Sequence, residues 1–121
     1  MTYSLFARRL GGEAGYDPGK LVEVKNIELG ASDSKVLDTL IESLDFFQLP
    51  SEEEKRVIGS DGDEWILEGV SHGKYHVAPR WCASSYDVKK RGLEAFLALC
   101  RFLVDKSMLS ERPKNKGHKL I

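Results

Sequence analysis

One stretch of the chain, residues 63–81 (DEWILEGVSHGKYHVAPRW), concentrates side chains that could do chemistry. Glu68, His76 and Arg80 offer a carboxylate, an imidazole and a guanidinium. If these three groups converge in a cleft, they form a plausible site for a small enzyme or a ligand-binding protein. The alternative is structural: the same residues would be the solvated face of a two-faced hairpin.

The hairpin consists of two predicted strands, residues 64–70 and 74–81, and its loop decides where the charges lie. A two-residue turn at His72–Gly73 would pair Glu68 with Val77. A three-residue loop, Ser71–His72–Gly73, would instead pair Glu68 with His76 and Glu64 with Arg80. We predict the second register, because it sorts the side chains into a charged face and an apolar face. The expected apolar face carries Trp65, Leu67, Tyr75 and Val77.

Other chemistries lack support in the sequence. Cys82 and His76 are six residues apart on one strand, roughly 20 Å when extended, which is too far for a thiolate and its base. Glu68 and His76 are too few ligands for a metal site. Nucleotide-binding and acyl-transfer motifs are absent. We therefore predict no catalytic residues, no metal and no cofactor, and we lean towards a protein that is not an enzyme.

Length and composition indicate an ordinary core. The chain has 121 residues, of which 41% are hydrophobic, so residues 1–108 are predicted to form one domain. Residues 109–121 show no periodicity and are predicted to be a mobile basic tail. No apolar run is long enough for a membrane span or a secretory signal, and the two cysteines, Cys82 and Cys100, form no recognisable set. We expect a cytoplasmic protein that does not contact a membrane.

The net charge of −1 conceals a division along the chain. Residues 38–68 contain ten acids against Lys55 and Arg56, a net of −8, whereas residues 106–121 carry five basic residues against Glu111, a net of +4. The basic run at residues 89–91 is interpreted as the solvated side of a helix, so nucleic acid is not an expected partner. An acidic surface instead predicts a protein partner with a basic surface. The predicted interaction surface comprises Glu52, Glu53, Glu54, Asp61, Asp63, Glu64 and Trp81.

Hydrophobic periodicity places the remaining elements. Strands are expected at residues 3–10 and 20–29, the second with a bulge near Lys25 and Asn26. A helix is expected to begin at one of three N-caps, Ser32, Asp33 or Ser34, and to continue until Pro50 stops it. A second helix is expected to begin between residues 85 and 88 and to run to about residue 106. The order ββαββα favours an α+β fold, an antiparallel sheet of about four strands with both helices packed on one face.

The motifs D-G-x-x-W-x-x-E and Y-H-x-x-x-R-W, followed by a helix, resemble a loose group of small uncharacterised bacterial proteins. The matching residues are Asp61, Gly62, Trp65, Glu68, Tyr75, His76, Arg80 and Trp81. The resemblance covers about residues 44–104. It implies a bacterial or phage origin and a compact α+β domain, and it implies no activity.

Together these observations lead to two functional hypotheses. The first is a small, non-enzymatic bacterial protein that binds a macromolecule through an acidic surface, as an immunity-type or other inhibitory protein does. The second is the small enzyme or ligand-binding protein that uses Glu68, His76 and Arg80. The sequence specifies no oligomeric state.

Overall fold

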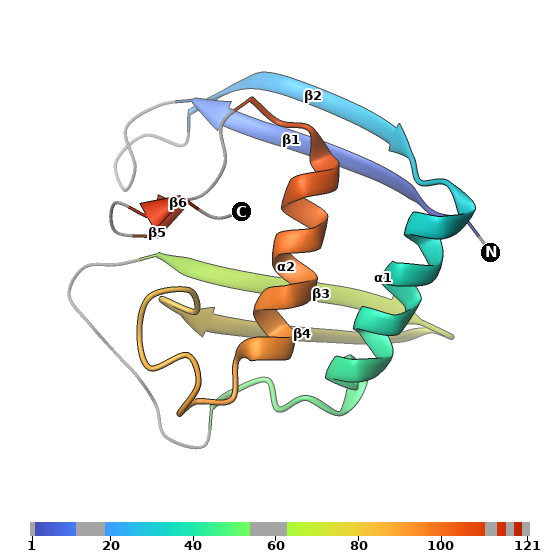
Figure 1. Cartoon of the computed structure of the whole chain (residues 1–121). Coiled ribbons are helices and arrows are strands. Elements are labelled where there is room, and N and C mark those ends of the chain that lie inside the picture. Colours follow the sequence, from blue (N-terminus) through green and yellow to red (C-terminus); the bar gives the residue numbers. More distant parts are fainter. Residues whose placement is uncertain (1, 12–18, 54–62, 111–113, 116–117, 120–121) are drawn as a thin grey trace. The chain divides into compact units, whose positions relative to one another are not determined.

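The computed structural model describes residues 2–11, 19–53, 63–110, 114–115 and 118–119. The chain divides into two compact units. Unit 1 contains residues 1–39 and 101–121, and unit 2 contains residues 40–100. Each unit contains one hairpin of two long antiparallel strands (Figure 1).

The hairpin of unit 1 pairs β1 (Ser4–Gly11) with β2 (Lys20–Glu28). Its register shifts between Arg9 and Leu10, which leaves Val22 without a partner. The bulge predicted near Lys25 and Asn26 is therefore wrong. Side chains alternate without a break from Glu23 to the buried Leu29, so the strand needs no correction there.

The first helix, α1, spans Ala31–Leu44. The predicted caps are wrong, because Ser34 lies inside the helix and is fully buried. Its hydroxyl accepts a hydrogen bond from the Tyr3 backbone N–H (3.1 Å) and donates one to the Leu29 carbonyl (3.3 Å). Ser34 thus joins the start of α1 to the strands of unit 1.

The end of α1 also differs from the prediction. Asp45 adopts a left-handed conformation with φ 51°, which ends the helix five residues before Pro50. A short 3₁₀ helix, η1 (Phe46–Gln48), follows and buries Phe46. The chain then continues extended through Leu49.

The hairpin of unit 2 pairs β3 (Glu64–Ser71) with β4 (Lys74–Trp81). Trp65, Ala78 and Phe96 are buried in this unit, as is Cys82, and Trp65 was expected in the core. The second helix, α2, spans Glu94–Ser107 and carries the buried Cys100.

Helix α2 begins later than predicted. Residues 82–92 form turns, and three of them have positive φ: Cys82 (44°), Asp87 (45°) and Gly92 (70°). A right-handed helix requires negative φ at every position, so it cannot start before Gly92. Hydrophobic periodicity does not register these backbone conformations.

The α+β class and the order ββαββα are confirmed. The four long strands pair two by two, and in the tail two short strands, β5 (Lys114–Asn115) and β6 (His118–Lys119), also pair. No helix in the described ranges is both long and apolar enough to cross a membrane. The predicted mobility of residues 109–121 stays a prediction.

Candidate functional site

The turn of the β3–β4 hairpin decides which side chains meet. Ser71 pairs with Lys74, which leaves a two-residue turn in which His72 (φ 51°) and Gly73 (φ 78°) both have positive φ. These are the conformations of a type I′ turn, and histidine is one of the residues that adopt them more readily. The predicted three-residue loop is therefore wrong.

This register separates the predicted catalytic group. Gly69 pairs with His76, and Glu68 pairs with Val77. Because paired residues point to the same side of an antiparallel sheet and successive residues alternate, Glu68 and His76 lie on opposite faces. Tyr75 and Val77 were predicted to share a face with Trp65 and Leu67. They lie on the opposite face. The three side chains Glu68, His76 and Arg80 do not converge.

We call the buried side of the hairpin the inner face. It comprises Trp65, Leu67, Gly69 and Ser71 of β3 with Lys74, His76, Ala78 and Arg80 of β4. His76 Nε2 lies 2.5 Å from the Leu49 carbonyl oxygen, and its ring makes an edge contact with Phe46, 5.1 Å between centroids. His76 therefore holds the chain that follows η1.

Arg80 is 3% exposed and holds the next two residues of the same segment. Its guanidinium donates to the carbonyls of Pro50 (2.6 Å) and Ser51 (3.5 Å), and also to its own neighbour Pro79 (2.8 Å). It lies 5.9 Å from the centre of the Phe96 ring. Burial lowers the pKa of Arg80, opposed by the nearby negative charge of Glu53.

Arg91 completes this arrangement through an ion pair with Glu53. Arg91 Nε lies 2.9 Å from Glu53 Oε2, and Nη2 contacts Oε1, so the contact is bidentate. The hydrogen bonds from Arg91 lower the pKa of Glu53, and those to Glu53 raise the pKa of Arg91. We call His76, Arg80 and Arg91 the clamp, because together they hold residues 49–53.

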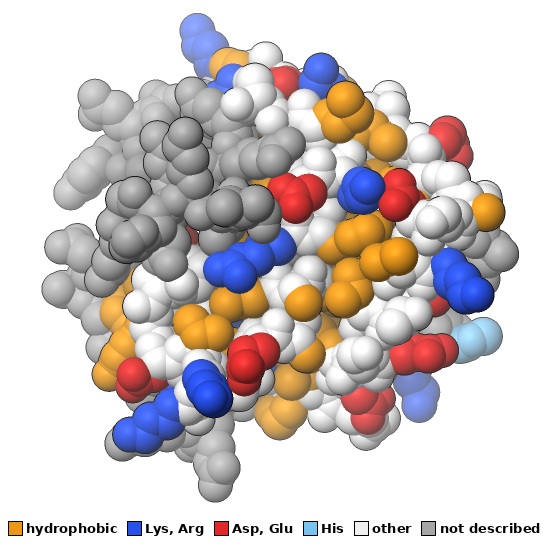
Figure 2. Space-filling view, in the orientation of Figure 1, with side chains coloured by type: hydrophobic (Ala, Val, Ile, Leu, Met, Phe, Trp, Pro, Cys, Tyr) orange, Lys and Arg blue, Asp and Glu red, His pale blue; other side chains and the backbone are white. Residues whose placement is uncertain are grey.

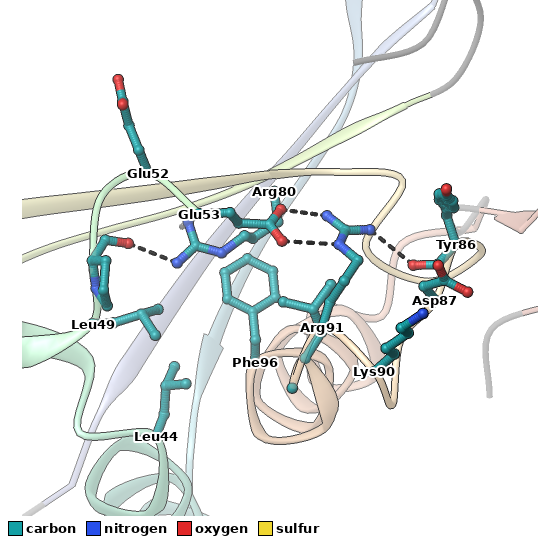
Figure 3. Close-up of a pocket in the computed structure, with 13 residues that line it drawn as sticks. Leu44, Leu49, Glu52, Glu53, Arg80, Tyr86, Asp87, Lys90, Arg91 and Phe96 are labelled. Atoms are coloured by element: carbon teal, nitrogen blue, oxygen red, sulfur yellow. Dashed lines mark hydrogen bonds and ion pairs between the residues drawn. The ribbon is translucent and has the colours of Figure 1, made fainter. Parts of the chain in front are cut away.

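A pocket of about 440 Å³ opens beside the clamp, entirely within unit 2 (Figure 3). Leu44, Leu49, Leu93 and Phe96 form much of its apolar wall. Its lining also includes three basic and three acidic side chains: Arg80, Lys90, Arg91, Glu52, Glu53 and Asp87. Figure 3 shows the Glu52 side chain pointing away from the two arginines.

The opposite side of the hairpin, which we call the outer face, is open. It comprises Glu64, Ile66, Glu68 and Val70 of β3 with Tyr75, Val77, Pro79 and Trp81 of β4. Ile66, Val70 and Tyr75 are 52%, 68% and 60% exposed. The Tyr75 hydroxyl donates to Glu68 Oε2 (2.9 Å), and this bond raises the pKa of Tyr75.

The residues of the predicted acidic surface have different environments. Glu52, Asp63 and Glu64 are exposed, and Asp63 accepts a hydrogen bond from the Trp65 indole (2.9 Å). Glu53 is neutralised by Arg91. Trp81 is partly exposed and packs edge-on against Tyr86. Glu54 and Asp61 lie outside the described residues.

On the side shown in Figure 2, the described acidic side chains do not form one large patch. Acidic and basic side chains that the structure describes are interspersed there among hydrophobic ones. The acids that could act together are therefore better sought within a single element, and Glu64 and Glu68 on the outer face form such a set.

Sequence reasoning missed Arg91, Tyr75, Ile66 and Val70. The last three lie on one face in the two-residue register, which is the alternative to the predicted loop. Arg91 was grouped with Lys89 and Lys90 as a solvated basic run, yet its side chain is only 8% exposed. No pattern in the sequence links it to Glu53, 38 residues earlier.

Comparison of the chain with protein-family models, with curated proteins and with solved structures gives no match. The resemblance to small bacterial proteins thus stays a prediction carried by its motif residues. Of these, Trp65, His76 and Arg80 belong to the inner face, whereas Glu68 and Tyr75 belong to the outer face.

Proposed function

We propose that this is a non-enzymatic protein-binding module whose outer face contacts a partner protein with a basic, partly apolar surface. The single observation that supports it best is the grouping of Ile66, Val70 and Tyr75, all more than half exposed, on one side of one hairpin. The proposal includes an inhibitory, immunity-type role in a bacterial cytoplasm.

The apolar side chains of the outer face remain exposed, so burial in the described structure does not explain them. Single exposed apolar side chains are common, but neighbouring ones on one sheet face are typical of interaction surfaces. Val70 and Tyr75 are direct cross-strand partners. Tyrosine contributes strongly at interfaces because it combines a large apolar ring with a hydroxyl.

The charges of the outer face define the partner's chemistry. Glu64 and Glu68 are exposed and flank Ile66 along β3, and the outer face carries no basic side chain. Carboxylates beside an apolar patch favour a partner that presents lysine or arginine around apolar side chains. Glu52 and Asp63 are further exposed acids of unit 2.

Affinity capture from the source cells, followed by titration of the captured protein with purified components, tests the proposal. Glu68→Lys and Tyr75→Ser are each expected to weaken binding roughly tenfold or more, since they reverse a charge and remove an anchor. Glu42→Lys is the matched control, because Glu42 is also exposed in unit 2 and lies on α1. Equal affinities for the Glu68→Lys, Tyr75→Ser and control proteins would reject the outer face as the contact.

The rival hypothesis, an enzyme built on Glu68, His76 and Arg80, loses its support. Glu68 lies on the other side of the sheet, and His76 Nε2 and the two terminal nitrogens of Arg80 bond to backbone carbonyls. The pocket beside Arg80 does not restore that hypothesis, because neither Glu68 nor His76 lines it.

A further inference from the structure

We propose that the pocket of unit 2 is a binding site for a small molecule with a carboxylate at one end and an apolar body at the other. In this proposal the ligand carboxylate takes the place of Glu53 on Arg91. The inference is independent of the outer face, because the pocket-lining residues named above and the outer-face residues do not overlap.

Arg91 is prepared to hold a carboxylate. Its guanidinium donates to the backbone carbonyls of Trp81 (2.9 Å) and Tyr86 (2.8 Å) and lies 5.9 Å from the Tyr86 ring centre. These contacts fix its position without the help of Glu53. Its remaining edge makes the two-point contact by which arginine recognises carboxylates.

Glu53 is the exchangeable half of the pair. Arg91 is the only hydrogen-bond partner of its carboxylate among the described residues, and its side chain is 17% exposed. A carboxylate from solution can therefore compete for the same two donors. Glu53 acts as an internal ligand that keeps Arg91 paired when the pocket contains only solvent.

The basic side chains near Glu53 favour the binding of a second carboxylate in the pocket. Arg80 is buried, donates only to carbonyls, and has no carboxylate partner among the described side chains. Lys90 is exposed on the lining of the pocket. Glu52 and Asp87 also line it and oppose an anion, but both are exposed to solvent, whereas Arg80 is not.

The pocket wall specifies the rest of the ligand. Leu44 and Leu49 lie on the other side of the Phe96 ring from Arg91 (Figure 3). A volume of about 440 Å³ lies within the usual range for small-molecule sites. A short carboxylic acid with an aliphatic or phenyl body fits both the carboxylate position on Arg91 and the apolar wall.

The probe for the test is 3-phenylpropionate, with 3-phenylpropionamide as its uncharged counterpart, titrated calorimetrically at pH 7. Wild type is expected to bind the acid at least tenfold more tightly than the amide. Glu53→Gln is expected to bind the acid about fivefold more tightly than wild type, because the charged competitor is gone. Lys89→Gln, an exposed change outside the pocket lining, is expected to leave affinity unchanged.

Arg91→Lys keeps the charge but loses the two-point contact, so it is expected to weaken binding of the acid about tenfold. Circular dichroism checks that each variant is folded. Failure of the acid to bind, equal binding of acid and amide, or no gain in Glu53→Gln overturns the proposal. Inorganic phosphate binding as tightly as the acid also overturns it, because the apolar wall would then contribute nothing.

Discussion

The two faces of the β3–β4 hairpin are built from alternate residues of the same two strands, yet they differ in how their polar groups are used. On the inner face, His76 and Arg80 bond to the backbone carbonyls of Leu49, Pro50 and Ser51. On the outer face, Glu68 and Tyr75 bond only to each other among the described residues and remain exposed.

The comparison separates motif residues that bond to the backbone of the same unit from motif residues that remain exposed. A histidine and an arginine near a pocket suggest catalysis, but here both side chains bond to backbone carbonyls of the segment after η1. Tyr75, Val70 and Ile66, in contrast, stay more than half exposed in the described part of unit 2. We therefore expect the inner face to contribute to stability, and we propose the outer face for recognition.

Arg80→Met gives the largest expected loss of stability. It leaves the carbonyls of Pro50 and Ser51 without their donor, and we expect the free energy of unfolding to fall by about 2–4 kcal/mol. Lys90→Met is the control, because Lys90 lines the same pocket but is exposed; its expected change is within about 0.5 kcal/mol. Urea unfolding measures both, and equal losses would contradict the clamp.

Glu53→Gln is expected to cost about 2 kcal/mol at pH 7, because it breaks a mostly buried ion pair. The pKa of Glu53 is lowered in the folded protein, so its contribution is present above the unfolded pKa of about 4.3 and is lost as pH falls towards the folded pKa. Wild type and Glu53→Gln should therefore converge in urea unfolding as pH is lowered from 6 to 3. A constant difference across that range would show that Glu53 does not act as a charge.

Gly69→Ala tests how closely the inner face packs on η1. An added Cβ would lie 2.9 Å from Phe46 Cε2, so a ring must move, and we expect a loss of about 1–2 kcal/mol. Gly30→Ala meets nothing within 4 Å and should cause no loss. Thermal unfolding of the two variants compares them, and a harmless Gly69→Ala would mean that Phe46 is not seated against β3.

Glu68→Gln is the smallest change and probes the outer face alone. The hydrogen bond to Glu68 raises the pKa of Tyr75, so removing the carboxylate charge should lower that pKa towards its ordinary value. Ultraviolet titration of the phenol in the wild type and in Glu68→Gln measures the difference. An unchanged titration curve would place Tyr75 away from Glu68.

Much of the fold follows from the sequence, because periodicity and turn residues act locally. Strands 64–70 and 74–81 were predicted to within one residue, and the order ββαββα is confirmed. Apart from the misplaced bulge and caps, the errors involve residues with positive φ: Asp45 ends α1, Asp87 and Gly92 delay α2, and His72 shortens the hairpin loop. Three of these four residues are not glycine, so the residue type alone does not predict the positive φ.

The candidate site was harder to predict because its contacts join distant segments. Arg80 was expected on a charged, solvated face, since a buried arginine is rare unless it is paired. Its partners are backbone carbonyls 29 and 30 residues away, and a carbonyl belongs to every residue type. Side-chain patterns therefore cannot indicate which carbonyls need a donor.

The division between the faces depends on the hairpin register, and nuclear Overhauser contacts between assigned side chains measure it directly. We predict contacts between the His76 and Phe46 rings, whose centroids are 5.1 Å apart, and between Tyr75 and its cross-strand partner Val70. Contacts between the side chains of Glu68 and His76 would place both on one face and contradict the account.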